Sequence, residues 1–283
     1  MSTGNAGIAQ GIELQVMKVT KSHKPSFDTN FRVSYEPATW ASFAIFVFLA
    51  FVTFTVELNA ISIVLHIVSL WLMLRCAVRS SVLSTPHAGS TRKPVKHEEG
   101  LFARRYCDKC GIRQPLRTKH CSETGRCVAT YDHYCFFVGC AISEQNHKIF
   151  VTMLLFASTC VAWDVWILSK SVWQNTGFLF GFYITVLGLS VFPLILVVSL
   201  FLYHVYLIIT AQTTWEHLSR ENITYLQGVP DGVNPFSRGV LGNIKEFIFR
   251  PSNEPPIEWA PTWREGDDSS TCFILDNQYY SCF

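Results

Sequence analysis

The chain has 283 residues, of which 49% are hydrophobic and 16% are charged, and its formal net charge is +2. Since charged residues make up about a quarter of an ordinary soluble domain, this composition argues against a soluble protein and indicates a membrane protein. The near-neutral charge gives no reason to expect a nucleic-acid partner. The ten cysteines are few for a disulfide scaffold of this length, and their clustering at metal spacing favours a reducing compartment.

Residues 1–38 are polar and mixed in charge, and they lack the basic and apolar blocks of a secretory signal peptide. We therefore expect a cytosolic N-terminal segment. The first apolar run that follows it is then predicted to remain in the membrane as an anchor.

Two apolar runs follow, over residues 39–56 and 58–74. Each has about the 17–25 residues that a helix needs to cross a bilayer, so residues 39–75 are predicted to form a transmembrane hairpin. A buried hairpin in the core of a soluble protein is the alternative. Four basic residues follow the second run, namely Arg75, Arg79, Arg92 and Lys93. They place its end in the cytosol by the positive-inside rule.

Two further apolar runs cover residues 149–168 and 178–210. The first contains one acid, Asp164, between two tryptophans, which favour the headgroup region. We therefore expect Asp164 near the far end of its span, not as a buried proton relay. The second run is 33 residues long with Pro193 inside it, which predicts one tilted or kinked helix.

Four spans predict an all-α polytopic membrane protein whose cytosolic domain, residues 76–148, lies between helices 2 and 3. Spans three and four occupy residues 149–210, and residues 211–283 form a cytosolic C-terminal region. Thirteen Lys and Arg residues lie in 75–148, whereas only Lys170 lies on the opposite side. This charge distribution agrees with two cytosolic termini.

The cytosolic domain begins with a C-x2-C pair that is followed by a histidine and a third cysteine. These four residues are Cys107, Cys110, His120 and Cys127. Three thiolates and one imidazole suit a tetrahedral zinc site, and a polar loop without its own apolar core needs such a staple to hold its shape. Unrelated cytosolic thiols and a surface histidine are the alternative.

The tetrad Asp132-His133-Tyr134-Cys135 has a different chemistry. A thiol becomes nucleophilic when a base takes its proton, and a carboxylate can orient that base. In an extended segment, side chains at i and i+2 share a face, so His133 can approach Cys135 while Asp132 pairs with His133. From the spacing alone, catalysis and metal ligation stay equally open.

These motifs, in this order, resemble the cysteine-rich domain of the DHHC protein S-acyltransferases, here as a DHYC variant. In chain order, the matching residues are Cys107, Cys110, Pro115, Arg117, His120, Cys121, Cys127, Val128, the tetrad, Asn146 and Phe150. After the last span, Thr213-Thr214-Trp215-Glu216 is similar to the family's TTxE motif. Asn234-Pro235-Phe236 is similar to its Asn-Pro-aromatic motif.

The resemblance implies a palmitoyltransferase with a two-step ping-pong reaction. Cys135 would attack the thioester of a long-chain acyl-CoA, and the acyl group would then pass to a cysteine of a membrane-associated protein. In this scheme His133 is the base, Asp132 orients it, and zinc is structural. The partners would be acyl-CoA, protein substrates and the lipid bilayer of the Golgi, the endoplasmic reticulum or the plasma membrane.

The motifs outside the cytosolic loop are predicted to support the site. The topology allows Thr214 and Glu216 to contact Asp132, although a helix cap by Thr213 or Thr214 is the alternative. Asn234 is expected to start a turn that docks the C-terminal region against the loop.

The chain departs from the family where members usually carry a second zinc set. These positions read Thr124, Tyr134 and Ala141, and of that set only Cys121 remains. We therefore expect one structural zinc and a degenerate second site, with the tetrad braced by packing through Tyr134. A catalytically weak relative that acts as a membrane scaffold or accessory subunit is the alternative function.

Overall fold

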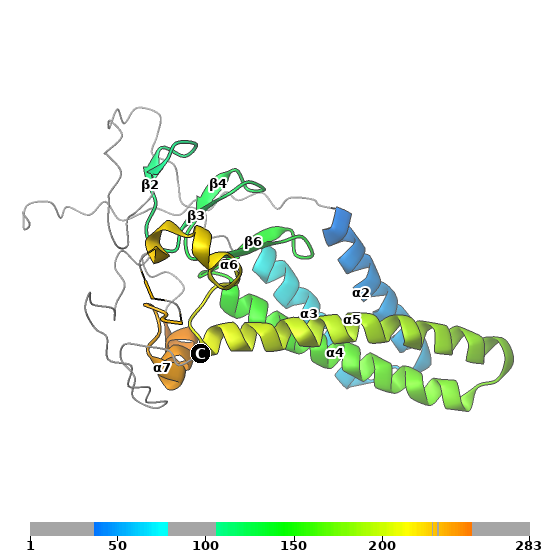
Figure 1. The fold of residues 1–283 in the computed structure, drawn as a ribbon. Helices are drawn as coiled ribbons and strands as arrows, with labels where there is room; N and C mark the ends of the chain where they lie inside the picture. Colours follow the sequence, from blue (N-terminus) through cyan, green and yellow to red (C-terminus); the bar gives the residue numbers. More distant parts are fainter. Residues whose placement is uncertain (1–36, 79–105, 228, 231, 251–283) are drawn as a thin grey trace, which may run out of the picture.

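The computed structural model describes residues 37–78, 106–227, 229–230 and 232–250 (Figure 1). Within these residues, a bundle of long helices carries short β-hairpins and further helices at one end. Most of the N-terminal segment, the basic residues at 79, 92 and 93, and the tail beyond residue 250 lie outside the described residues. The expectations for them stay predictions.

Four helices build the bundle: α2 (Pro37–Val56), α3 (Ala60–Val78), α4 (His147–Gln174) and α5 (Gly177–Ile209). Among the described residues, these are the four helices that are long and apolar enough to cross a membrane. Pro193 lies inside α5, which runs on as one helix as expected. The predicted fold class is confirmed: four candidate spans carry a cysteine-rich domain between the second and the third.

The outer faces of the bundle are apolar. Phe51, Trp173, Phe178 and Phe192 expose 65% to 89% of their surface. Large apolar side chains exposed on this scale are unfavourable in water, but lipid tails are a good solvent for them. The bundle is therefore that of a multi-pass membrane protein.

The expectation that Asp164 is not buried was wrong. This side chain is 1% exposed, and its Oδ2 atom lies 3.3 Å from Nε2 of His66 on α3. The two tryptophans that suggested an interface position pack against each other, with ring centroids 4.8 Å apart. A carboxylate within a span turns inward when a neighbouring helix offers a polar partner, and no sequence pattern along α4 alone reveals that partner.

The cysteine-rich domain consists of three antiparallel two-stranded hairpins. They are β1 (Tyr106–Cys107) with β2 (Ile112–Arg113), β3 (Lys119–Cys121) with β4 (Arg126–Val128), and β5 (Tyr131–Cys135) with β6 (Cys140–Ser143). An isolated two-stranded hairpin is marginally stable in water. Each hairpin therefore depends on a metal site or on packing against its neighbours.

The β5–β6 hairpin is attached to the helix bundle. The buried side chain of Asn146, just before α4, accepts a hydrogen bond from the backbone N–H of Ser143 (2.9 Å) and donates one to the carbonyl of Ala141 (3.0 Å). Apolar side chains from this hairpin, α3 and α4 form one buried cluster: Leu72, Cys76, Ala77, Cys135, Val138, Cys140, Ile142, Phe150, Met153 and Leu154. We call it the junction cluster.

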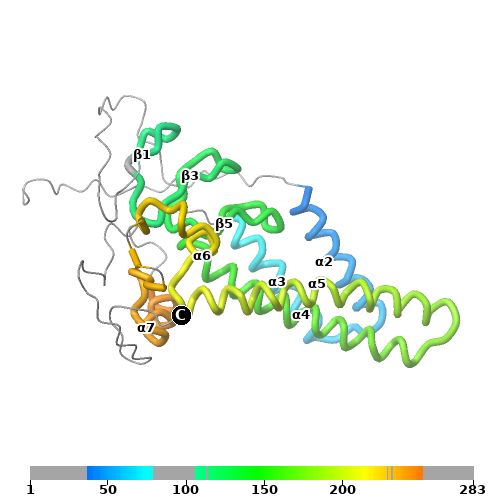
Figure 2. The backbone as a smooth tube through the Cα atoms, in the orientation of Figure 1, coloured from blue at the N-terminus to red at the C-terminus, as the bar shows by residue number. Residues whose placement is uncertain are grey.

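After α5 the chain returns along the hairpins, as the tube in Figure 2 shows. It forms α6 (Thr214–Ser219), two short 3-10 turns at Arg220–Asn222 and Thr224–Leu226, and α7 (Gly239–Phe249). Helix α6 contacts β5 and α7 contacts α5. The C-terminal motifs thus reach the same end of the bundle as the tetrad.

Candidate functional site

The first two hairpins bring the predicted metal ligands together. The donor atoms of Cys107, Cys110, His120 and Cys127 all lie within 4.8 Å of one another. The Sγ atoms of Cys107 and Cys110 lie 3.5 Å and 3.2 Å from His120 Nδ1. In a tetrahedral zinc site with Zn–S of about 2.3 Å and Zn–N of about 2.0–2.1 Å, such atoms are about 3.5 Å apart. The four residues therefore form a cluster that could bind a metal, and its donors suit zinc.

The degenerate second set forms an apolar cluster. Its members are Cys121, Val128, Tyr131, Tyr134 and Ala141, with Trp215 of α6 packed against them. The thiol of Cys121 donates to Glu123 at 3.3 Å. Within the part of the chain that the structure describes, no metal-ligand group includes Cys121. Tyr134 is packed within this apolar cluster, and its role in bracing the tetrad stays a prediction.

The side chain of Asp132, on strand β5, contacts both the adjacent residue His133 and helix α6. The Nδ1 atom of His133 lies 2.6 Å from Asp132 Oδ2, as the tetrad predicted. The backbone N–H of Thr214 donates to Asp132 Oδ1 (2.8 Å), and its hydroxyl donates to Oδ2 (2.7 Å). The predicted contact between Thr214 and Asp132 is thus confirmed. The carboxylate of Glu216 instead accepts hydrogen bonds from Arg117.

The ionisation of the pair follows from its contacts. Burial alone would raise the pKa of the Asp132 carboxyl, but the hydrogen bond from His133 and the charge of nearby histidines hold this pKa well below its usual range. Burial alone would lower the pKa of His133, but its hydrogen bonds with Asp132 and Cys135 raise it to about 10. The imidazole therefore binds a proton strongly at neutral pH.

Cys135 ends β5 at the boundary between hairpin and bundle. It belongs to the junction cluster and is 7% exposed. The turn after it needs Gly139, whose φ of 72° is favourable only for glycine and whose N–H donates to the Cys135 carbonyl at 2.8 Å. The thiol thus lies beside the His133 imidazole on one side and the apolar end of the helices on the other.

Two histidines of the site were missed by the sequence analysis. Nε2 of His147 lies 3.1 Å from Nδ1 of His204, and the ring of His204 lies 5.8 Å from that of His133. Phe150 packs edge-on against His133 at 5.4 Å. A sequence signal did exist, because His147 begins the third span and His204 lies near the end of the fourth. Both therefore belong to the helix ends that meet the tetrad.

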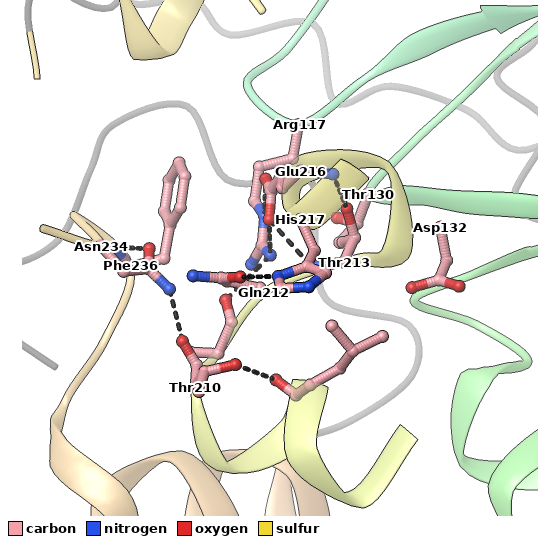
Figure 3. A network of polar contacts seen from close by, with 12 residues as sticks. Arg117, Thr130, Asp132, Thr210, Gln212, Thr213, Glu216, His217, Asn234 and Phe236 are labelled. Carbon is pink, nitrogen blue, oxygen red and sulfur yellow. Dashed lines mark hydrogen bonds and ion pairs between the residues drawn. The ribbon is translucent and has the colours of Figure 1, made fainter. Parts of the chain in front are cut away.

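The side chain of Arg117 forms a buried ion pair with Glu216 (Figure 3). Arg117 donates from Nε to Oε1 (2.7 Å) and from Nη2 to Oε2 (2.6 Å). Its φ of 61° is unusual for a residue other than glycine. Glu216 also accepts the hydroxyl of Tyr225 (2.8 Å) and the N–H of Thr213 (2.9 Å). The motif in the sequence includes Arg117 but does not indicate this partner.

The remaining motif residues fix the ends of helices. Thr213 and Glu216 form a reciprocal capping box at the start of α6, so the helix-cap alternative holds for Thr213 while Thr214 contacts Asp132. The side chain of Asn234 donates to the carbonyl of Thr210, and Phe236 packs with Leu116 of the cysteine-rich domain. Asn234 thus starts the expected docking turn.

Comparisons with known proteins agree with this geometry. Residues 101–221 match the family model described as DHHC palmitoyltransferase. This part of the chain is therefore similar to a DHHC palmitoyltransferase domain. The matched residues include the four candidate metal ligands, the tetrad and the α6 motif, and the match extends through two of the four candidate spans.

Several relatives are named as protein S-acyltransferases or palmitoyltransferases. Protein S-acyltransferase 10 of Arabidopsis thaliana is 34% identical over 179 residues, which cover 60% of this chain and 50% of that protein. Palmitoyltransferase ZDHHC12 of Homo sapiens is 33% identical over 177 residues (59% and 62%). The ZDHHC12 of Mus musculus is 37% identical over 153 residues (51% and 55%). The matches span 43% to 62% of the length of the first relatives.

The Arg117–Glu216 pair is expected to be essential for stability. In Glu216→Ala the guanidinium stays buried without its partner, which destabilises by about 3–5 kcal/mol and lowers the melting temperature by roughly 10 °C. Thermal unfolding of the purified full chain in detergent measures this. The control is Arg238→Ala, which removes an exposed pair with Glu246 and is expected to cost about 1 kcal/mol or less. Equal effects of the two variants would show that the buried pair is not special.

Tyr134→His is expected to restore neither a second metal nor extra activity. The imidazole would enter the apolar cluster without the other ligands, because Thr124 and Ala141 still occupy two positions of the set. Metal content per chain should equal that of the wild type, while His120→Ala should lower it as a positive control. A gain of metal in Tyr134→His would mean that packing is not what supports the tetrad.

Proposed function

We propose that this protein is an S-acyltransferase that moves palmitoyl or a similar long-chain acyl group from acyl-CoA to cysteines of membrane-associated proteins. The observation that carries this proposal is the arrangement of Asp132, His133 and Cys135 within a DHHC domain, at the apolar end of a membrane-spanning bundle. The names of the relatives support it.

The chemistry requires two transfers at one sulfur. The proton of Cys135 passes to His133, so the resting pair is a thiolate beside an imidazolium, which Asp132 stabilises. The Cys135 thiolate attacks the carbonyl carbon of the thioester, the bond to the CoA sulfur breaks, and CoA leaves as a thiolate that regains a proton from the imidazolium. In the second step a substrate cysteine attacks the S-acyl Cys135, again losing its proton to His133. Cys135 then returns as the free thiol.

The surroundings of the thiol suit an acyl chain. Val197, Leu200 and Phe201 of α5 pack, partly buried, against the junction cluster that holds Cys135. Each buried methylene contributes about 0.8 kcal/mol, so a long chain that enters the bundle from this end gains most of its binding energy there. This favours long-chain donors.

A cavity of about 150 Å³ has Thr213 and His147 among its lining residues. Its lining includes the basic residues Lys148, Arg238 and Arg250 as well as the acids Glu144 and Glu246. Basic groups attract the phosphates of CoA. We assign the CoA headgroup to this end of the molecule on that basis.

Zinc held by Cys107, Cys110, His120 and Cys127 has a structural role in this proposal. It would link the first two hairpins, which are too small to be stable alone. Next to the tetrad, Phe136 and Phe137 are 50% and 53% exposed, and their carbonyls accept hydrogen bonds from Thr39 and Ser42 of α2. The catalytic hairpin therefore lies at the bilayer surface.

The same proposal fixes the topology. Residues 39–75 and 149–210 span the membrane, and residues 1–38, 76–148 and 211–283 are cytosolic. The basic loop between spans two and three supports this orientation. The enzyme would then reside in the Golgi, the endoplasmic reticulum or the plasma membrane, with its thiol facing cytosolic substrates.

Labelled palmitoyl-CoA tests the proposal directly. The purified full chain should become labelled at Cys135 through a hydroxylamine-sensitive bond, because a thioester is cleaved by that reagent. Cys135→Ala should carry no such label, whereas Cys76→Ala, which removes another buried thiol of the junction cluster, should still be labelled. An unlabelled wild type would instead support the membrane scaffold or accessory subunit.

The pH dependence of Cys135 tests the ionic pair. With its pKa raised to about 10, the imidazolium of His133 persists well above neutral pH, whereas in Asp132→Asn it should deprotonate near the ordinary value of about 6.5. Between about pH 7 and 10, only the wild type keeps a cation beside the sulfur. Alkylation of Cys135 at pH 7.5 should therefore slow about ten-fold in the variant.

Peptide mass spectrometry can follow this alkylation without interference from the other cysteines. The difference should shrink below about pH 6, where both imidazoles are protonated. Asp108→Asn, which changes an exposed aspartate of the same domain, is the matched control and should react like the wild type. If Cys135 were alkylated equally slowly at pH 7.5 in the wild type and in Asp132→Asn, the proposed role of the pair would be excluded.

A further inference from the structure

A buried polar stripe runs along α3 within the bundle. Ser62, His66 and Ser69 lie four and three residues apart, on one face of the helix, and each is 5% exposed or less. Opposite this stripe, α4 presents Asp164, which is 1% exposed, and Cys160, which is fully buried. Polar groups within the membrane-spanning part of a protein are unfavourable unless they have hydrogen-bond or ionic partners.

Several of these groups lack a hydrogen-bond partner within the described part of the chain. They are Ser62 Oγ, Ser69 Oγ, His66 Nε2, both carboxylate oxygens of Asp164 and, from α2, Thr53 Oγ1. Buried polar atoms in native proteins are nearly always paired, and exceptions point to a bound water or ion. These groups therefore indicate that a water or an ion is a further component of the cluster.

The orientation of His66 shows where this component would lie. Nδ1 is 2.9 Å from the carbonyl of Ser62, and because a carbonyl only accepts, Nδ1 carries the hydrogen. A neutral imidazole then directs the lone pair of Nε2 towards Asp164 Oδ2, 3.3 Å away. Two lone pairs at that distance repel each other unless a positive charge lies between them. A second-shell carbonyl of this kind is typical of metal-binding histidines.

The third donor distinguishes a metal ion from a proton. Cys160 lies one helical turn before Asp164, and the donor atoms of His66, Cys160 and Asp164 all lie within 4.8 Å of one another. A proton shared by His66 and Asp164 would use only two of these three donors, and the buried hydroxyls of Ser62 and Thr53 would still be without a partner. A metal ion would use all three donors, and nitrogen and oxygen ligands of a tetrahedral ion at about 2.0–2.1 Å are about 3.3–3.4 Å apart.

The charges also balance. A divalent ion with one thiolate, one carboxylate and one neutral imidazole has no net charge, which avoids the large cost of an isolated charge in a low-dielectric interior. The rings of Phe46 and Phe54 lie 5.2 Å from the His66 ring and screen it from lipid. Three protein donors leave a fourth position for a hydroxyl or a water molecule.

We propose that His66, Cys160 and Asp164 form a second metal site, within the membrane-spanning bundle, that binds a divalent transition metal such as zinc. The site joins α3 to α4 independently of the cysteine-rich domain. It does not depend on the acyltransferase activity, so failure of one proposal leaves the other intact.

Metal analysis of the full chain, purified in detergent, tests the site. Elemental mass spectrometry should find about two divalent ions per chain. His66→Gln, Cys160→Ala and Asp164→Asn should each retain about one, and His120→Ala should lose the other. Cys76→Ala is the matched control, because it removes a buried thiol of α3 outside both metal clusters, and it should retain both ions.

Cobalt absorption gives a second measurement, and it does not depend on whether variants of the cysteine-rich domain, such as His120→Ala, are stable. Loading with Co²⁺ should give a thiolate-to-metal absorption band that loses about a quarter of its intensity in Cys160→Ala, since one of about four thiolates is removed. A single ion that His120→Ala removes and His66→Gln leaves would overturn the proposal, and so would an unchanged band in Cys160→Ala. Loss of the second ion in Cys121→Ser alone would instead place it in the cysteine-rich domain.

Discussion

The buried ion pair between Arg117 and Glu216 is the contact on which the site depends. It joins residues 99 positions apart, the cysteine-rich domain on one side and the start of α6 on the other. Such a pair is favourable only when its remaining hydrogen-bonding groups are satisfied, and Tyr225, Thr213 and the carbonyl of Ala211 satisfy them. With α6 held in this way, Thr214 meets Asp132, and Asp132 in turn orients His133.

The cysteine-rich domain combines two means of stabilising small hairpins. Its first half brings three thiols and an imidazole together, as a metal site requires. Its second half, which contains Cys135, has Tyr134 and Trp215 in a packed apolar cluster. With a tyrosine at this position, Asp132 and His133 still form their hydrogen bond.

The helix bundle has the reverse distribution of a soluble core. Its large apolar side chains face outward, and its polar side chains, including His66, Asp164 and His204, face inward. In hydrocarbon, polar groups must find partners within the protein. The bundle thus contains two polar regions, one around His204 next to the tetrad and one between α3 and α4.

The sequence by itself determined the four spans, the first metal set and the DHYC tetrad. Each depends on a local pattern, either the length of an apolar run or the spacing of a few ligands. Only the tertiary structure decided that Asp164 lies next to His66, that Glu216 binds Arg117 and that His147 and His204 lie near the tetrad. These partners lie on different elements. Which of them meet is set by how the helices and hairpins pack against one another, and no pattern along a single segment contains that information.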